Sequence, residues 1–534
     1  MAGLLGAPGV VVVLGLLIVV AVVAAAVRYV RVPYSVALVL TGLALALLPG
    51  APHLQLTPGI ILTVFLPILL FYGAYNLDLA DLRAALTPVA LLALPGVLVT
   101  AGLVGAALHL AAGLPWADAL LFGTIVAATD PVAVLSIFGE VGAPRRLATI
   151  VTGESLFNDG TALVLFAAVL EVATAHGLDA GATVQHFLVE VLGGLALGAA
   201  VGIVGSTVLR RIDDALLETT LTLIMAYGGY LLATALGSSG PLETVAAGLL
   251  LGGRGAQAMS PTTRLQAGAT WEFLDFLANS LLFLLVGLAL RPIGEATVAR
   301  LGWGVWWPLL VAIVAVTVAR ALVVGVVGLA LRRAGQPLPG GWRTVITWAG
   351  LRGAVSLAAA LSLPAALPSR DLLLTLTFGI VLFTILAQGL TIQPLLTRRG
   401  LVGDEGTRHD VELALGRLRT VEAAAREVET LRRADALDVH LAQRLAERYA
   451  AQGRALRAAL DATYHSSAAL ERQQEVEALR HLLRVQHEAA RDAYARGQLS
   501  RGAFRDLIAE VDREMADLDG VSWDARDVGA SDAV

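Results

Sequence analysis

Residues 146–175 read RLATIVTGESLFNDGTALVLFAAVLEVATA, an apolar run with two acidic residues in its first half, Glu154 and Asp159. A helix needs about 20 residues to cross the hydrocarbon core of a bilayer, so this run is long enough to span a membrane. An ionisable side chain at that depth costs at least ~2.5–3.5 kcal/mol and is therefore kept near a partner, water or substrate. The run predicts a membrane helix that carries a functional site.

The rest of the first 400 residues has the same apolar character. The whole chain is 57% hydrophobic and 15% charged, and its charged residues concentrate after residue 400. Ordinary soluble domains are about 45–50% apolar and 25% charged. The chain has no cysteine, which excludes disulfides, thiolate metal sites and cysteine nucleophiles. We predict about thirteen membrane spans: 9–27, 33–49, 56–75, 85–112, 117–138, 146–175, 184–209, 216–236, 241–253, 271–290, 303–331, 342–366 and 371–396.

The placement of arginine predicts the orientation of these spans. With thirteen spans and the N-terminus outside, the cytoplasmic loops carry fourteen arginines and the outer loops carry three. Cytoplasmic loops of membrane proteins are enriched in basic residues. The run 241–253 is short, so twelve spans are an alternative. With twelve spans, however, the arginine-rich loops would no longer fall on the same side of the membrane. We expect a multi-pass protein of the cell membrane whose C-terminal tail is cytoplasmic.

Charged side chains inside the predicted spans mark the candidate site. Three of them are acids and two are bases, so pairing them all as structural salt bridges leaves one acid over. Intramembrane ionisable residues commonly face the interior of a helix bundle and mark ion or proton pathways. The five residues are Asp130, Glu154, Asp159, Arg320 and Arg352.

Two of the spans are predicted to be discontinuous. Residues 129–131 (Thr-Asp-Pro) lie within the fifth span, where proline removes a backbone donor and clashes with the preceding turn. In the twelfth span Gly350 and Gly353 flank Arg352 and loosen the helix. Broken helices at membrane depth line cavities, and a second one seven spans after the first is typical of an inverted-repeat transporter. The expected fold class is an all-α polytopic membrane protein with inverted repeats.

The sixth span presents two polar faces. Ser155 and Asp159 are four residues apart and share one helical face, whereas Glu154 and Asn158 share the neighbouring face. The first face offers oxygens of the kind that hard cations prefer, and the second offers a carboxylate that can pair with an arginine. A free carboxylate holds either a proton or a cation, and this competition would couple the transport of the two.

Four segments, in this order and spacing, closely resemble the sodium/proton exchanger family of monovalent cation:proton antiporters. They are 129–138 (TDPVAVLSIF), 153–160 (GESLFNDG), 281–290 (LLFLLVGLAL) and 347–357 (TWAGLRGAVSL), and the resemblance covers residues 9–400. It implies a transporter and not an enzyme, with no cofactor beyond the transported Na⁺ and H⁺. It also implies a six-helix core domain that moves against a dimerisation domain, in a homodimer.

The resemblance further implies roles for single residues. Asp159 would bind the cation and the proton, and the Asn-Asp pair that it forms with its neighbour resembles the electroneutral branch of the family. Together the cation site would comprise Asp159, Asp130, Ser155, Thr129 and Asn158.

Three further residues would have structural roles by the same resemblance. Glu154 in the sixth span would pair with Arg320 in the eleventh. Arg352 would stabilise the crossing of the two broken helices. These three side chains would hold the site without binding the transported ion.

Two positions do not fit the family pattern simply. Family members often carry an acid in the third span after a Leu-Pro pair, but residues 66–73 read LPILLFYG, with Tyr72 at that position. This substitution bears on any acidic contribution from that helix and on the choice between ions. Glu243 begins the ninth span, and we interpret it as a helix N-terminal charge just inside the membrane surface.

The chain after residue 400 is predicted to be a separate region. Residues 401–520 have helical periodicity and predict a cytoplasmic helical bundle or a dimerising arm, and residues 521–534 are predicted to be disordered. The acidic balance of the tail argues against binding to nucleic acid or anionic lipid.

Three other functions share part of this sequence pattern. A K⁺/H⁺ antiporter differs only in the preferred cation, which the sequence does not decide. An intramembrane aspartyl protease also needs two carboxylates, but neither Asp130 nor Asp159 has the flanking residues typical of those enzymes. A passive cation channel typically places rings of acids or carbonyls around a symmetric pore, whereas this chain has one asymmetric internal site.

Overall fold

The structure is a computed structural model that describes residues 7–29, 32–48, 57–174, 180–256, 259–401, 405–465, 468–496 and 498–521. Helices are the only regular secondary structure in these ranges. The chain divides into two compact units, Met1–Gly403 and Asp404–Val534.

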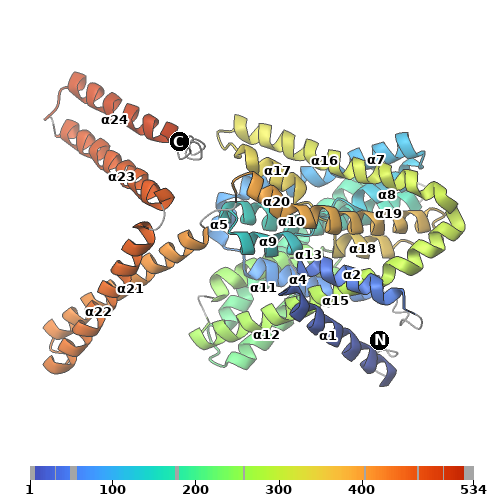
Figure 1. Ribbon diagram of the computed structural model, residues 1–534, viewed down its shortest axis with the longest axis horizontal. Coiled ribbons are helices and arrows are strands. Elements are labelled where there is room, and N and C mark those ends of the chain that lie inside the picture. The colour runs from blue at the N-terminus through green and yellow to red at the C-terminus, as the bar shows by residue number, and fades with distance from the viewer. Residues whose placement is uncertain are drawn as a thin grey trace, which may run out of the picture. The chain divides into compact units, whose positions relative to one another are not determined.

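The first unit is a bundle of helices that follow the predicted apolar runs, as Figure 1 shows. Each of the predicted runs coincides with one helix or with a chain of shorter ones. In sequence order the helices are α1 (Ala7–Val27), α2 (Tyr34–Ala46), α3 (Pro58–Ile60), η1 (Ile61–Phe65), α4 (Leu66–Tyr75), α5 (Leu79–Ala84), α6 (Leu86–Ala93), α7 (Pro95–Ala112), α8 (Trp116–Ile125), α9 (Val132–Val141), α10 (Arg145–Thr174), α11 (Ala180–Leu209), α12 (Ala215–Ala235), α13 (Gly240–Leu250), η2 (Leu251–Gly255), α15 (Pro261–Leu301), η3 (Gly302–Val305), α16 (Trp306–Arg333), α17 (Gly340–Trp348), α18 (Ala354–Leu361), α19 (Arg370–Phe383), η4 (Thr384–Gln388) and α20 (Gly389–Arg398).

Among the described residues, 9 helical stretches are long and apolar enough to cross a membrane. The shorter apolar helices include α2, α8 and α9, and the last two are halves of one predicted span. The all-helical membrane fold is therefore as predicted, whereas the count of thirteen spans stays a prediction.

Helix α15 differs from its prediction in length. The apolar run covers 271–290, but the helix extends from Pro261 to Leu301, 41 residues. The flanking segments are polar enough to have been interpreted as loops. Helical backbone continues through both flanks: residues 262–270 contain no proline, and on the other side the helix runs past Pro292 to Leu301.

Close packing fixes α15 against three other helices. A Cβ atom on Gly42 of α2 would overlap the backbone of Leu284, so α2 and α15 approach closely through glycine. Tyr34 of α2 also hydrogen-bonds Ser280 of α15, at 2.8 Å between the hydroxyl oxygens. Nearer its N-terminus α15 carries Trp271, which packs against α4 and α12.

Trp271 is completely buried between helices. Its indole N–H donates to the hydroxyl of Thr222 on α12 at 3.0 Å, and its ring lies 4.3 Å from that of Phe71 on α4, measured between centroids. Buried aromatic side chains contribute large apolar areas to a core. Helices α2, α4, α12 and α15 thus form one packed group.

The second unit consists of two pairs of helices. Its helices are α21 (Glu405–Arg433), α22 (Val439–His465), α23 (Ala468–Ala495) and α24 (Arg501–Val521). Arg457 of α22 binds Glu422 of α21 at 2.6 Å, and Tyr494 of α23 stacks on Phe504 of α24 with ring centroids 4.6 Å apart. The predicted disordered segment lies outside the described residues, except for Val521 at the end of α24.

Candidate functional site

The first unit contains two broken helices that touch at their breaks. The chain is not helical over 126–131, between α8 and α9, or over 349–353, between α17 and α18. The backbone N–H of Asp130 donates to the carbonyl oxygen of Leu351 at 2.8 Å, which joins one break to the other. Non-helical backbone at membrane depth is tolerated where it is buried in protein or lines a cavity.

Arg352 occupies the centre of this crossing. Its side chain is buried, and Nη1 donates to the carbonyl oxygens of Ala127 and Ala128, at 2.8 and 2.7 Å. These carbonyls follow the C-terminal end of α8, where the helix dipole favours a cation. The backbone N–H of Arg352 donates to the hydroxyl of Thr384, the first residue of the π-helical segment η4, at 3.1 Å. Arg352 therefore ties both broken helices to a third element.

Asp130 lies on the side of the crossing where α9 and α18 begin. Its Oδ1 accepts the backbone N–H of Val132 at 3.0 Å, and the backbone N–H of Ala354 also donates to this carboxylate. Val132 and Ala354 are the first residues of α9 and α18, so the carboxylate lies where two helix N-termini favour negative charge. A Cβ atom on Gly353 would overlap the carboxylate, so glycine is required here for close approach. Asp130 is thus held in place by backbone donors.

Helix α10 brings Ser155 and Asn158 against Thr129 at the first break. The hydroxyl oxygens of Thr129 and Ser155 are 3.0 Å apart. Asn158 uses both of its polar atoms on Thr129: Nδ2 donates to the hydroxyl at 2.6 Å, and Oδ1 accepts the backbone N–H at 3.3 Å. Asn158 therefore positions Thr129, and its expected role as an ion ligand stays a prediction.

The expected partner of Glu154 is Arg320 of α16, and the structure brings them together. The two side chains form a bidentate ion pair: Nη1 of Arg320 binds Oε1 of Glu154, and Nη2 binds Oε2 at 2.8 Å. Arg320 also donates to the carbonyl oxygen of Ile346 on α17 at 3.1 Å. Both charged side chains are buried, and paired bidentate geometry is strong and specific for arginine. Helices α10, α16 and α17 are thereby fixed to one another.

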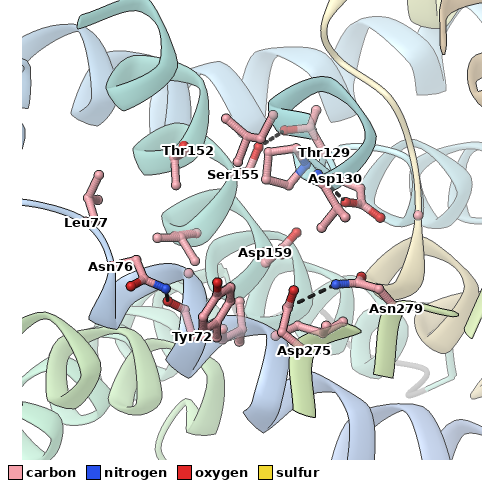
Figure 2. A pocket seen from close by; sticks show the side chains of 18 of the residues that line it. Tyr72, Asn76, Leu77, Thr129, Asp130, Thr152, Ser155, Asp159, Asp275 and Asn279 are labelled. Atoms are coloured by element: carbon pink, nitrogen blue, oxygen red, sulfur yellow. Dashed lines mark hydrogen bonds between the residues drawn. The ribbon is translucent and has the colours of Figure 1, made fainter. Parts of the chain in front are cut away.

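Asp159 lines a cavity of about 760 Å³, shown in Figure 2. Thr129, Asp130 and Ser155 line the same cavity, which extends to Asp81 near the surface of the unit. The side chain of Asp159 is 9% exposed and makes no hydrogen bond or ion pair with any described residue. Asp159 is therefore an acid of the predicted set that has no hydrogen-bond or ion-pair partner among the described residues. Its neighbours supply hydroxyl and carboxylate oxygens, a ligand set suited to a hard cation.

The wall of the cavity opposite Asp159 contains residues that sequence reasoning missed. Asp275 and Asn279 of α15 line the cavity together with Tyr72 of α4, and Figure 2 shows all three below Asp159. Asp275 accepts a hydrogen bond from Asn279 Nδ2 at 3.0 Å. The signal was available, because Asp275 is an acid inside a predicted span, the same criterion that selected Asp130.

Glu243 lies in the first turn of α13, as expected, and its side chain is completely buried among protein atoms. Its Oε1 has no hydrogen-bond partner among the described residues. The carboxylate packs against Gly229 of α12, where a Cβ atom would overlap it. The position of a residue in a helix does not reveal which neighbouring helix covers it.

Two crossed broken helices around an acid-lined cavity define the class of the protein, a secondary transporter and not an enzyme. Comparison with protein families agrees: the model of the transmembrane sodium/hydrogen exchanger matches residues 15–398. The chain belongs to this family.

Individual relatives were found by sequence and by structure. The chain is 38% identical over 396 residues to the Na⁺/H⁺ antiporter ApNhaP of Aphanothece halophytica, an alignment covering 73% of this chain and 74% of the relative. It is 39% identical over 402 residues to the Na⁺/H⁺ antiporter NhaP of Pseudomonas aeruginosa, covering 70% and 92%. The solved structure of the sodium proton antiporter MjNhaP1 from Methanocaldococcus jannaschii has the same fold, with a TM-score of 0.58 at 22% identity over 73% of this chain and 97% of that one.

Proposed function

We propose that this protein exchanges a monovalent cation, with Na⁺ preferred, for H⁺ across the cell membrane by alternating access. The observation that carries the proposal is Asp159, a nearly buried carboxylate without a partner at the wall of a cavity that also offers the oxygens of Asp130, Thr129 and Ser155. The names of the relatives support Na⁺ and H⁺ as the exchanged ions.

The chemistry follows from competition at one carboxylate. When Asp159 is ionised it binds the cation together with neighbouring oxygens, and when it is protonated it no longer attracts the cation. In this mechanism Asp130 stays charged through the cycle, and the two backbone N–H groups that donate to it favour that form. Glu154 is held by Arg320 and does not take part. Each passage of the site across the membrane therefore carries either the cation or the proton.

One switching carboxylate gives an electroneutral exchange of one cation for one proton. A membrane potential of 100 mV is worth ~2.3 kcal/mol for each elementary charge moved, so it should leave an electroneutral equilibrium unshifted. The measurement clamps vesicles at several potentials with valinomycin and finds the sodium gradient that nulls proton flux. A null point that moves with voltage would show that a second charge is carried and that the single-carboxylate mechanism is wrong.

The assembly belongs to the same proposal. We place the N-terminus outside and the tail in the cytoplasm, because most loop arginines then lie on the cytoplasmic side. Two copies form a homodimer, as the resemblance to the family implies. The tail, α21–α24, is a cytoplasmic helical domain attached to the transporter.

Proton flux in reconstituted vesicles tests the function directly. Vesicles are made acidic inside, a pH-sensitive dye is trapped in them, and NaCl, LiCl, KCl or choline chloride is added outside. Internal alkalinisation that requires Na⁺ and saturates with its concentration is expected. A response to K⁺ alone would favour the K⁺/H⁺ antiporter. Cation uptake without proton movement would indicate a channel and contradict the proposal.

A further inference from the structure

The α15 wall of the cavity carries two polar side chains one helical turn apart. Asp275 and Asn279 are four residues apart, so they project from the same face of the helix. Both line the cavity, and Figure 2 shows them across it from Asp130 and Asp159. Trp271, one turn earlier, is completely buried, so this part of α15 is anchored and its polar face is held toward the cavity.

The hydrogen bond between these two side chains leaves acceptor oxygens unused. Asn279 donates from Nδ2 to Asp275 Oδ1 at 3.0 Å. Asn279 Oδ1 has no hydrogen-bond partner among the described residues, although the residue is only 7% exposed. A buried acceptor without a donor costs free energy, so such an atom in a native structure calls for a ligand or water. Carboxylate oxygens and amide oxygens are both ligands of hard cations. A carboxylate beside an unpartnered amide oxygen is therefore suited to bind a cation.

The helix across from α15 lacks a charge of its own. Tyr72 of α4 lines the cavity where an acid was expected. Its hydroxyl contributes an oxygen but no negative charge. On this side of the cavity the acids are therefore those of α15, Asp275 and the more exposed Glu272, and Asp275 is the one that contacts Asn279.

We propose that Asp275 and Asn279 form a second cation-binding station, which takes up a partly hydrated monovalent cation from the cavity and passes it to the site at Asp159. This inference rests on the proposed function, because the station feeds the same exchange. A first, looser site raises the local concentration of the cation beside the carboxylate that must compete with protons. The station sets the apparent affinity for the cation, whereas Asp159 carries the exchange.

Exchange kinetics test the station. Asp275→Asn is compared with wild type in acid-loaded vesicles over a series of NaCl concentrations. The half-saturating sodium concentration is expected to rise about tenfold, the change that corresponds to 1.4 kcal/mol of lost interaction, while the maximal rate is retained. Glu272→Gln is the matched control, since it removes an acid from the same helix and the same cavity at an exposed position. It should leave the half-saturating concentration unchanged.

A second variant keeps the test decisive if Asp275→Asn does not fold. Asn279→Ala removes only the amide and should raise the half-saturating concentration in the same direction. Unchanged half-saturation in a folded variant, or an equal shift in the Glu272→Gln control, would overturn the station.

Direct binding separates this inference from the proposed function. In an Asp159→Asn background, NaCl should still raise the melting temperature relative to choline chloride, because a ligand that binds only the folded state stabilises it. Adding Asp275→Asn should remove that increase. If the sodium effect is absent with Asp275 intact, the station is wrong. If the wild type shows no proton flux but the sodium effect depends on Asp275, the proposed exchange fails and the station stands.

Discussion

The two walls of the cavity hold their polar side chains in different ways. On the wall formed by the broken helices and α10, Thr129 and Asp130 are fixed by hydrogen bonds from other elements, and Asp159 is left free. On the wall formed by α4 and α15, Asp275 and Asn279 bond only to each other and keep unused oxygens. In the proposed mechanism the first wall carries the exchanging group, whereas the second wall carries a charge outside that group. The reaction and the affinity for its substrate can therefore be changed independently.

The largest effect is expected at the free group of the first wall. Asp159→Asn should reduce exchange to the background of empty vesicles, because an amide of nearly the same shape cannot bind a proton and a cation in alternation. Dye recovery in acid-loaded vesicles measures the loss, and the elution profile in detergent checks folding. Exchange that persists near the wild-type rate would remove Asp159 from the mechanism.

The next largest effect concerns the ion pair behind the first wall. Glu154→Gln and Arg320→Ala should each cost ~3–5 kcal/mol of stability, because each leaves an unpaired buried charge, and the double variant should recover part of the loss. Melting temperature in detergent is the measurement. Asp81→Asn is the control, since it breaks the exposed pair with Arg145 at 3.0 Å, where ~0–1 kcal/mol is expected. Strictly additive losses in the double variant would mean that Glu154 and Arg320 do not interact.

A smaller effect is expected at the contact between the breaks. Gly353→Ala places a Cβ atom in the volume of the Asp130 carboxylate, and overpacking of this kind costs ~1–3 kcal/mol. Exchange should fall together with the melting temperature, because the carboxylate must move. Gly102→Ala on α7 is the control, since no atom lies within 4 Å of the added Cβ. Equal behaviour of the two variants would show that the breaks are not tightly packed.

The smallest effect is expected on the second wall. Tyr72→Glu adds a carboxylate to α4 and should lower the half-saturating sodium concentration about threefold, less than the tenfold change that 1.4 kcal/mol gives. Tyr72→Phe is the control. It removes only the hydroxyl, so it distinguishes the effect of the added charge from the effect of the lost hydroxyl. A change in maximal rate without a change in half-saturation would mean that this wall takes part in the exchange step itself.

The sequence predicts the first wall well and the second wall poorly. Pro131 and the glycines around Arg352 mark the breaks because their backbone chemistry is local. The contact between Asn158 and Thr129 was not predicted, because Thr129 lies at the break of another span and sequence periodicity reports only which residues share a face of one helix. Asp275 could have been selected as an acid inside a predicted span, but the sequence does not show that it faces the cavity, because that depends on how α15 packs against α2, α4 and α12.

The packing of α15 has a mechanical consequence. Hydrogen bonds of Tyr34 and Trp271 join α15 to α2 and α12, whereas those of Arg320 and Arg352 join α10, α16 and the broken helices. Sliding one group past the other leaves every one of these bonds intact. The activation barrier to that movement then depends on apolar side chains exchanging neighbours and on how well the displaced group matches the hydrocarbon thickness. Turnover should accordingly respond to the acyl-chain length of the surrounding lipid.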